Sequence, residues 1–355
     1  MTTEERSIAR EVSAVESQAV SGAPTTDRRF VVAALMLVMV LASMEMTVTS
    51  TAMPTIIGEL RGLEHYSWVA SLYLLAATVT MPLYGRLADV LGRKRVIVGA
   101  VVIFTVGSVL AALSHSMVQL ILFRGLQGLG AGGIMPVVLT ILGDLFTLKE
   151  CAKMQGLFSS VWGLSSLAGP ALGAGLVHTL GWRWVFLVNL PFGALGLLVL
   201  FWKYHDRQKP HSTVIDIVGI ALVTAASTSL LALVSRLGPD GWGWPMIAVL
   251  LSVFVVGAIV FFLHERKTTN PVMSPGLMAQ RDILVPIIAM ALFGATFLSL
   301  DTYVPLYVQG GRGGGATAAA AVVTPVMMTW ALSNMLSAPL LVRWGFRVTA
   351  LLARP

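Results

Sequence analysis

Apolar segments of about 20 residues recur along almost the whole chain, and this feature restricts the fold more than any other. A helix needs roughly 20 apolar residues to cross the hydrocarbon core of a bilayer. Short segments of alternating polarity, typical of a membrane barrel, are absent from the sequence. We therefore predict an all-α polytopic membrane protein. Its expected spans lie at about 30–57, 67–88, 96–114, 118–142, 154–179, 184–202, 214–235, 245–263, 283–309 and 317–342.

The composition supports a membrane location and argues against a soluble protein. Charged residues make up 12% of the chain and apolar residues 56%, whereas soluble domains contain about 25% charged residues. The formal net charge of +7 would suggest nucleic-acid binding in a soluble protein. Here the basic residues lie in short clusters between apolar segments, so we expect a lipid bilayer and no nucleic acid as a partner.

The distribution of lysine and arginine predicts the orientation in the membrane. If the polar residues 1–27 form a cytoplasmic tail, the cytoplasmic segments contain 19 of the 24 basic residues and the external loops contain four. Because cytoplasmic loops carry an excess of basic residues, both termini are expected on the cytoplasmic side of the cell membrane. A cleaved signal peptide at 28–43 is an alternative, but the apolar segment continues beyond Ser43.

The loop after the second segment combines a tight turn with a cluster of charges. Gly92 permits the turn between two helices, and Asp89 lies near a helix end, close to basic side chains. One interpretation is an ordinary basic cytoplasmic loop. The other is a conformational latch, in which Asp89 and Arg93 make charged contacts in only one state. The loop reads Gly85-Arg86-Leu87-Ala88-Asp89-Val90-Leu91-Gly92-Arg93-Lys94-Arg95.

Three charged residues within apolar segments are candidates for a functional site: Glu45, Arg124 and Asp301. A charge in the bilayer costs roughly 2.5–3.5 kcal/mol on insertion scales, so it is functional by default. Desolvation favours the neutral form of a carboxyl group, which suits Glu45 to reversible proton binding. Arg124 keeps its proton, so we expect it to tune a carboxylate in the same cavity or to form a structural ion pair. Three aspartates near cytoplasmic ends are expected to be surface charges: Asp144, Asp216 and Asp282.

The fifth segment carries a row of small residues. Ser165, Gly169 and Gly173 recur every four residues, so they share one helix face on which another helix can approach closely. Pro170 removes one backbone donor and allows a bend. Ordinary helix packing is sufficient to explain this pattern.

These motifs resemble those of the major facilitator superfamily. The loop at 85–95 is similar to the family's signature loop at nearly every position, and 120–131, around Arg124, resembles its second motif. Residues 182–193 and the surroundings of Glu45 resemble the drug:proton antiporter family with 14 spans, although an aspartate is more usual at position 45. The stretch 163–175 resembles the antiporter motif of proton-linked drug exporters, with Gly163, Gly169, Pro170 and Gly173 as its residues.

The resemblance implies a major facilitator fold, with a complete amino-terminal half and a partial carboxyl-terminal half. Facilitators have two similar six-helix halves, and 338–347 looks like a decayed second copy of the signature loop. The offset between the copies places the counterpart of Glu45 about one helical turn from Asp301. Four helices of the second half are then expected beyond this chain. The expected parts are a tail at 1–27, a six-helix bundle at 28–203, two linker helices at 204–266 and two further helices at 267–355.

The resemblance also implies proton-coupled export of lipophilic or cationic small molecules by alternating access, with Glu45, Arg124 and Asp301 at the coupling site. A transporter for a metabolite or an antibiotic, and a truncated product that transports nothing, are the alternatives. No enzyme is expected, because no nucleophile arrangement or Walker loop is present. The histidines lack metal-ligand spacing and Cys151 is the single cysteine, so we expect no metal, cofactor or internal disulfide.

Overall fold

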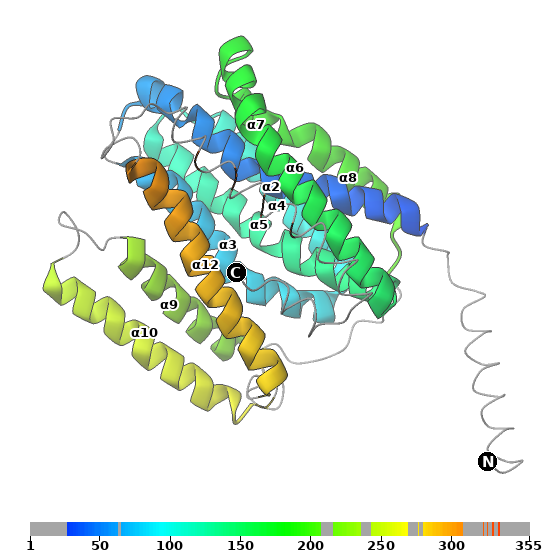
Figure 1. Ribbon diagram of the computed structural model, residues 1–355, viewed down its shortest axis with the longest axis vertical. Coiled ribbons are helices and arrows are strands. Elements are labelled where there is room, and N and C mark those ends of the chain that lie inside the picture. The colour runs from blue at the N-terminus through cyan, green and yellow to red at the C-terminus, as the bar shows by residue number, and fades with distance from the viewer. Residues whose placement is uncertain are drawn as a thin grey trace, which may run out of the picture.

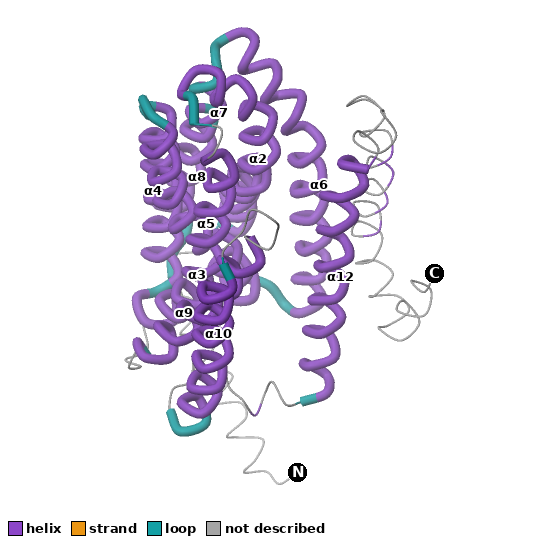
Figure 2. Tube along the Cα trace, turned by 90° about the vertical axis from the view of Figure 1, so that its left-hand side faces the viewer, coloured by secondary structure: helices purple, strands orange, loops and turns teal. Residues whose placement is uncertain are grey.

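The computed structural model describes residues 27–62, 65–206, 216–235, 243–268 and 280–307, with the single positions 276, 322, 325, 329 and 333. Within this part all regular secondary structure is helical, and Figure 2 shows no strand there. The helices are α2 (Arg28–Leu60), α3 (Tyr66–Leu91), α4 (Arg93–Ala112), α5 (Met117–Leu145), α6 (Leu148–Thr179), α7 (Trp184–Leu187), α8 (Asn189–Lys203), α9 (Ile217–Ser235), α10 (Trp244–Glu265) and α12 (Arg281–Leu306) (Figure 1).

These helices follow the apolar segments, which confirms the all-α prediction for the described residues. Seven helices in this part are long and apolar enough to cross a membrane. The sixth expected segment is divided into α7 and α8, which the apolar pattern alone does not show. Apart from positions 322, 325, 329 and 333, the tenth segment at 317–342 lies outside the described residues, as do the second loop copy at 338–347 and the tail at 1–26.

Local sequence signals set several helix ends. The Ser116 side chain accepts a hydrogen bond from the backbone N–H of Gln119 at the start of α5. Thr147 and Glu150 form a capping box at the start of α6, which satisfies backbone donors that have no partner inside the helix. Gly92 separates α3 from α4 with a φ of 91°, a conformation that glycine adopts without steric cost.

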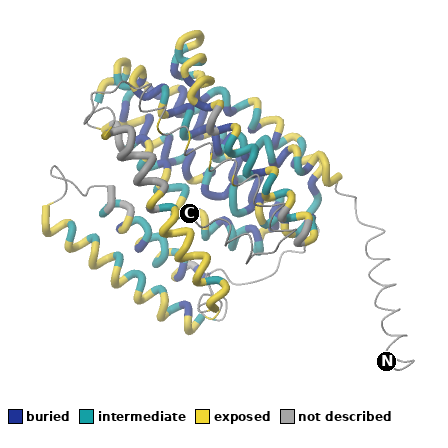
Figure 3. Tube along the Cα trace, in the orientation of Figure 1, coloured by how far each residue is buried: buried dark blue, intermediate teal, exposed yellow. Residues whose placement is uncertain are grey.

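Glycine allows the central helix α5 to approach both α3 and α4. A Cβ atom on Gly130 would lie 2.6 Å from the carbonyl oxygen of Ala100 in α4. A Cβ atom on Gly128 would overlap the carbonyl oxygen of Tyr73 in α3. α2 packs against α6 and α8 on the other side of the bundle. Figure 3 shows the buried residues concentrated in these packed helices.

The later helices are less buried. α9 packs against α10 and also contacts α3. The described side chains of α10 and α12 are mostly exposed and apolar (Figure 3), as expected of helices that face lipid or further helices. The proposed division of the chain at residues 203 and 266 stays a prediction.

Candidate functional site

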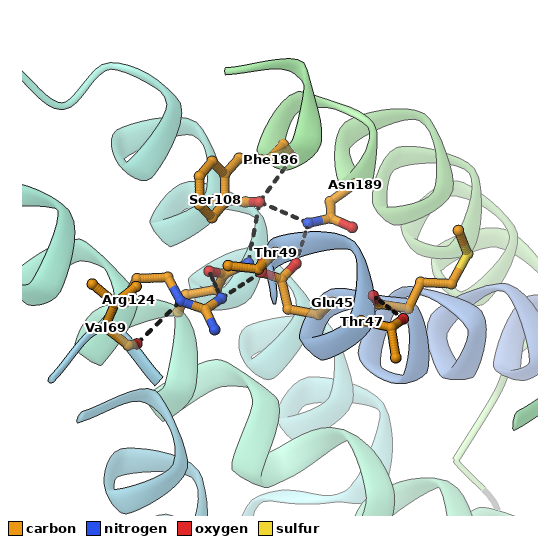
Figure 4. Close-up of polar contacts among 10 residues, drawn as sticks. Glu45, Thr47, Thr49, Val69, Ser108, Arg124, Phe186 and Asn189 are labelled. Carbon is orange, nitrogen blue, oxygen red and sulfur yellow. Dashed lines mark hydrogen bonds and ion pairs between the residues drawn. The ribbon is translucent and has the colours of Figure 1, made fainter. Parts of the chain in front are cut away.

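Glu45 lies near the middle of α2 and points into the bundle. Only 2% of the residue is exposed. Thr49, one turn further along α2, donates a hydrogen bond from its hydroxyl to Glu45 Oε1 at 3.0 Å (Figure 4). A buried carboxylate is costly unless it is paired and hydrogen-bonded, so its remaining partners define the site.

Arg124 supplies the opposite charge from α5. Its guanidinium forms an ion pair with Glu45 Oε1 and is almost completely buried (Figure 4). Arg124 also donates to Gln127 Oε1 at 2.8 Å and to the carbonyl oxygen of Val69 at 3.5 Å. Its Cζ atom lies 4.1 Å from the centre of the Tyr73 ring. The arginine therefore has partners that do not depend on the charge of Glu45.

Asn189 is the third partner of Glu45, and sequence reasoning missed it. Its amide nitrogen donates to Glu45 Oε2 at 2.5 Å and to Ser108 Oγ at 2.9 Å (Figure 4). Asn189 is the first residue of α8 and is 3% exposed. It lies in the stretch 182–193, which was recognised only as a family motif. The one available signal was an asparagine inside an apolar segment.

Ser108 closes the polar network from α4. Its hydroxyl donates to the carbonyl oxygen of Phe186 at 2.9 Å and accepts from Gln127 Nε2 at 3.2 Å. Residues of α2, α4, α5 and α8 thus form one closed ring of contacts around Glu45. Fully satisfied buried networks of this kind are rigid and specific.

The structure therefore brings two of the three predicted coupling residues into direct contact. Glu45 and Arg124 are 79 positions apart in sequence. Asp301 belongs to α12, but its side chain lies outside the described part of the structure. Its place in the same cavity stays a prediction.

The predicted latch residues lie at the junction of α3 and α4. Arg93 Nε lies 2.9 Å from Asp144 Oδ2 of α5, and Arg93 Nη2 lies 3.4 Å from Asp89 Oδ1. The expectation that Asp144 is a surface charge was wrong, because its carboxylate is largely buried against Arg93. A Cβ atom on Gly85 would meet nothing within 4 Å, so close packing does not require a glycine at this position.

A further carboxylate, Asp206, touches the same loop from beyond the end of α8. Its Oδ2 atom accepts a hydrogen bond from the backbone N–H of Lys94 at 3.0 Å, at the start of α4. A Cβ atom on Gly92 would lie 2.6 Å from this oxygen. Tyr204 donates to Asp206 Oδ1 at 3.3 Å, and burial together with the nearby Asp206 charge raises the pKa of Tyr204. The phenol therefore stays protonated and remains a donor.

The small-residue face of α6 packs on α2. A Cβ atom on Gly173 would lie 2.9 Å from the carbonyl oxygen of Val48, and one on Gly169 would overlap the Thr47 hydroxyl. Ser165 is buried on the same face. Pro170 is exposed and Gly163 half-buried, and α6 continues through both. The motif is thus a close contact between α6 and the part of α2 that follows Glu45.

A second charged cluster holds the end of the bundle at which α2 ends. Glu59 accepts hydrogen bonds from Trp182 Nε1 at 2.8 Å and from Arg183 Nη1 at 2.6 Å. The Arg183 guanidinium also lies 4.4 Å from the centre of the Trp182 ring. This cluster fixes the segment that leads through α7 to Asn189.

The linker helices α9 and α10 meet at another buried carboxylate. Asp216 lies 2.9 Å from His264 Nε2 and accepts a hydrogen bond from the Gly219 N–H at 2.9 Å. Burial raises the pKa of Asp216, but the hydrogen bonds from Gly219 and His264 outweigh it and leave the pKa below its usual value. Asp216 was wrongly expected on the surface, because its burial arises from packing between α9 and α10. Asp282, by contrast, is exposed as predicted.

Comparison with known proteins agrees with this architecture. The sequence pattern of the Major Facilitator Superfamily matches residues 35–355. The chain is 35% identical to Multidrug resistance protein 3 of Bacillus subtilis over 321 residues, covering 90% of this chain and 62% of that protein. It is 33% identical to Multidrug transporter protein MdtP of the same organism, covering 90% and 59%.

A similar fold is seen in the crystal structure of the human organic anion transporter MFSD10 (TETRAN). The TM-score is 0.55 at 16% identity, over 88% of this chain and 73% of that one, so this likeness concerns the fold alone. The chain spans about three fifths of the length of the two Bacillus relatives. Because the family pattern covers most of the chain and the helices agree with it, the chain belongs to the major facilitator superfamily of multi-pass membrane transporters.

Proposed function

We propose that this chain is a proton-coupled antiporter that exports lipophilic or cationic small molecules across the cytoplasmic membrane by alternating access. The observation that carries the proposal is the buried Glu45–Arg124 pair in the middle of the helical bundle. Two relatives that are at least 33% identical are named as multidrug proteins, which supports the class of substrate.

The chemistry of the pair explains how a proton and a cation can compete. Arg124 stays charged at physiological pH, so Glu45 is the member of the pair that changes its charge. A proton on Glu45 removes the negative charge that attracts a cationic substrate. Deprotonation restores that charge, so one site binds either a proton or a cation. In this mechanism, competition at Glu45 couples the two fluxes while the halves of the transporter rock around the site.

The contacts of Arg93 supply the conformational part of the proposal. Arg93 bridges Asp144 and Asp89 at the ends of α3, α4 and α5. The Asp89 side of this junction is half-exposed, and exposed ion pairs are individually weak. The contact between Arg93 and Asp89 can therefore open and close during transport without a large energetic cost, while Asp144 stays against Arg93. We propose that this junction is the latch, on the cytoplasmic side of the membrane.

Transport by reconstituted protein tests the coupling role of Glu45. The 355-residue chain would be placed in liposomes with an imposed pH gradient, and movement of ethidium, a lipophilic cation, would be followed by fluorescence. We expect gradient-driven movement in the wild type and its loss in Glu45→Gln. Asp282→Asn is the matched control, because it likewise changes a carboxylate to a carboxamide, at an exposed position at the start of α12. Movement that survives Glu45→Gln, or a wild-type chain that moves no dye, contradicts the proposal.

Cysteine labelling tests the proposed orientation. Cys151 is the single cysteine, so Cys151→Ser gives a background without thiols. His115→Cys, in the exposed loop between α4 and α5, should react with a membrane-impermeant maleimide in intact cells. Lys153→Cys should react only after the membrane is permeabilised. The reverse pattern of labelling would show that the orientation is wrong.

A further inference from the structure

The two carboxylate oxygens of Glu45 have different surroundings. Oε1 accepts from the Arg124 guanidinium and from the Thr49 hydroxyl. Oε2 accepts from the amide nitrogen of Asn189 at 2.5 Å. Because a carboxylate can only accept hydrogen bonds, the nitrogen and not the oxygen of this amide must face Glu45 in the charged state.

This asymmetry determines where a proton can bind. A proton on Oε1 would point toward Arg124, whose guanidinium has only donors and does not give up a proton. Oε2 lies away from that charge, so it is the better site. A protonated Oε2 needs an acceptor, however, and in the observed arrangement it faces the donor nitrogen of Asn189.

We infer that Asn189 is a positioning residue for the coupling proton, because its amide turns over when Glu45 Oε2 becomes protonated. The inference rests on the proposed function. A half-turn about the terminal bond of the side chain exchanges Nδ2 for Oδ1, and this bond has a broad, roughly two-fold preference. One proton from water binds Oε2, the new O–H donates to Asn189 Oδ1, and no other proton leaves the site.

The second partner of Asn189 can follow the same change. Ser108 Oγ accepts from Asn189 Nδ2 at 2.9 Å and donates to the Phe186 carbonyl oxygen at 2.9 Å. A hydroxyl is both donor and acceptor, and its hydrogen rotates freely. After the amide turns, Ser108 can direct its hydrogen to Asn189 Oδ1 while still accepting from Gln127 Nε2, and its hydrogen bond to the Phe186 carbonyl oxygen is then lost. The side chains around Glu45 can thus accept the protonated form without movement of the backbone.

Infrared difference spectroscopy of the reconstituted chain tests this role. Spectra would be recorded across a pH series, and the carboxyl C=O band that disappears in Glu45→Gln would be assigned to Glu45. In Asn189→Leu the protonated group loses its acceptor, so this band should move to higher frequency. It should also appear at a pH higher by about one unit, because a hydrogen bond to a charged group is about twice as strong as a neutral one.

Two further variants separate a specific role from a general structural effect. Asn189→Gln keeps the carboxamide and should restore much of the wild-type band. Thr80→Val removes a buried hydroxyl that bonds to Ala76 and not to the Glu45 ring, so it should leave the band unchanged. A Glu45 band in Asn189→Leu with the same frequency and pH dependence as in the wild type would overturn the inference and leave the proposed function standing. Absence of any Glu45-dependent band in the wild type would instead remove the proposed function.

A second measurement needs no substitution at Asn189 and so does not depend on whether Asn189→Leu folds. Asparagine occurs only at positions 189, 270 and 334, so labelling with ¹⁵N-asparagine gives three side-chain amide signals in NMR spectra. One signal should change at the pH at which the Glu45 band appears, and this change should be absent in Glu45→Gln. Three signals that stay constant through that pH would overturn the inference.

Discussion

The buried pair of Glu45 and Arg124 should respond asymmetrically to loss of either charge. Glu45→Gln leaves a guanidinium that cannot be neutralised. Arg124→Leu leaves a carboxylate that can be neutralised by a proton. The two variants therefore differ in how their stability depends on pH, although each removes one member of the same ion pair.

The partners that remain around each unpaired charge determine how much stability each variant should lose. Removal of one partner from a buried pair costs about 3–5 kcal/mol. For Glu45→Gln we expect the lower end, about 3 kcal/mol, because Arg124 keeps Gln127 at 2.8 Å and the Tyr73 ring at 4.1 Å. The stability of this variant should have no pH dependence from position 45, because the glutamine does not titrate. For Arg124→Leu the cost should be about 3–5 kcal/mol at alkaline pH and should fall by up to about 1.4 kcal/mol per pH unit on acidification.

The sign follows from proton linkage. A proton on Glu45 removes the unpaired buried charge that Arg124→Leu leaves behind, so the stability of this variant should rise as the pH falls. Unfolding in mixed micelles, followed by circular dichroism at about pH 8 and about pH 5, measures both variants. The double variant lacks both charges and should lose less than the sum of the single losses. Equal pH dependence in the two single variants, or simple additivity, would refute this reasoning.

Three other perturbations test neighbouring features. Gly130→Ala should cost about 1–3 kcal/mol of stability in the same unfolding assay, because its Cβ would lie 2.6 Å from a carbonyl oxygen of α4, whereas Gly143→Ala meets nothing within 4 Å and should cost little. The lowered pKa of Asp216 means that its contribution to the α9–α10 contact is lost as the pH falls through that pKa. Asp216→Asn should abolish this pH dependence, measured by disulfide cross-linking between cysteines placed on the two helices. Hydrogen bonds from the backbone and hydroxyl of Thr147 lower the pKa of Glu150, so the protection factors of the amides in the first turn of α6 should fall at low pH, and in Glu150→Ala they should be low at every pH.

The sequence was sufficient to predict the helices, because their length and polarity are dictated by the membrane. The apolar segments coincide with the described helices, and Glu45 and Arg124 stood out as charges in apolar surroundings. The sequence did not predict which helix faces are in contact. The burial of Asp144 and Asp216 depends on helices that meet only in three dimensions. An uncharged side chain such as Asn189 has no feature in the sequence that reveals its partner.

The Glu45–Arg124 pair also bears on the energy source of transport. Its opposite charges cancel, so the empty site carries no net charge. With the proposed function, one bound proton and one bound monovalent cation each give the site a single positive charge. Exchange of one for the other moves no net charge and is independent of the membrane voltage. Export of a neutral compound in exchange for a proton does move a charge, and gains about 2.3 kcal/mol for each 100 mV. The pair thus makes the pH difference alone the driving force for a monovalent cation, and adds the voltage for a neutral compound.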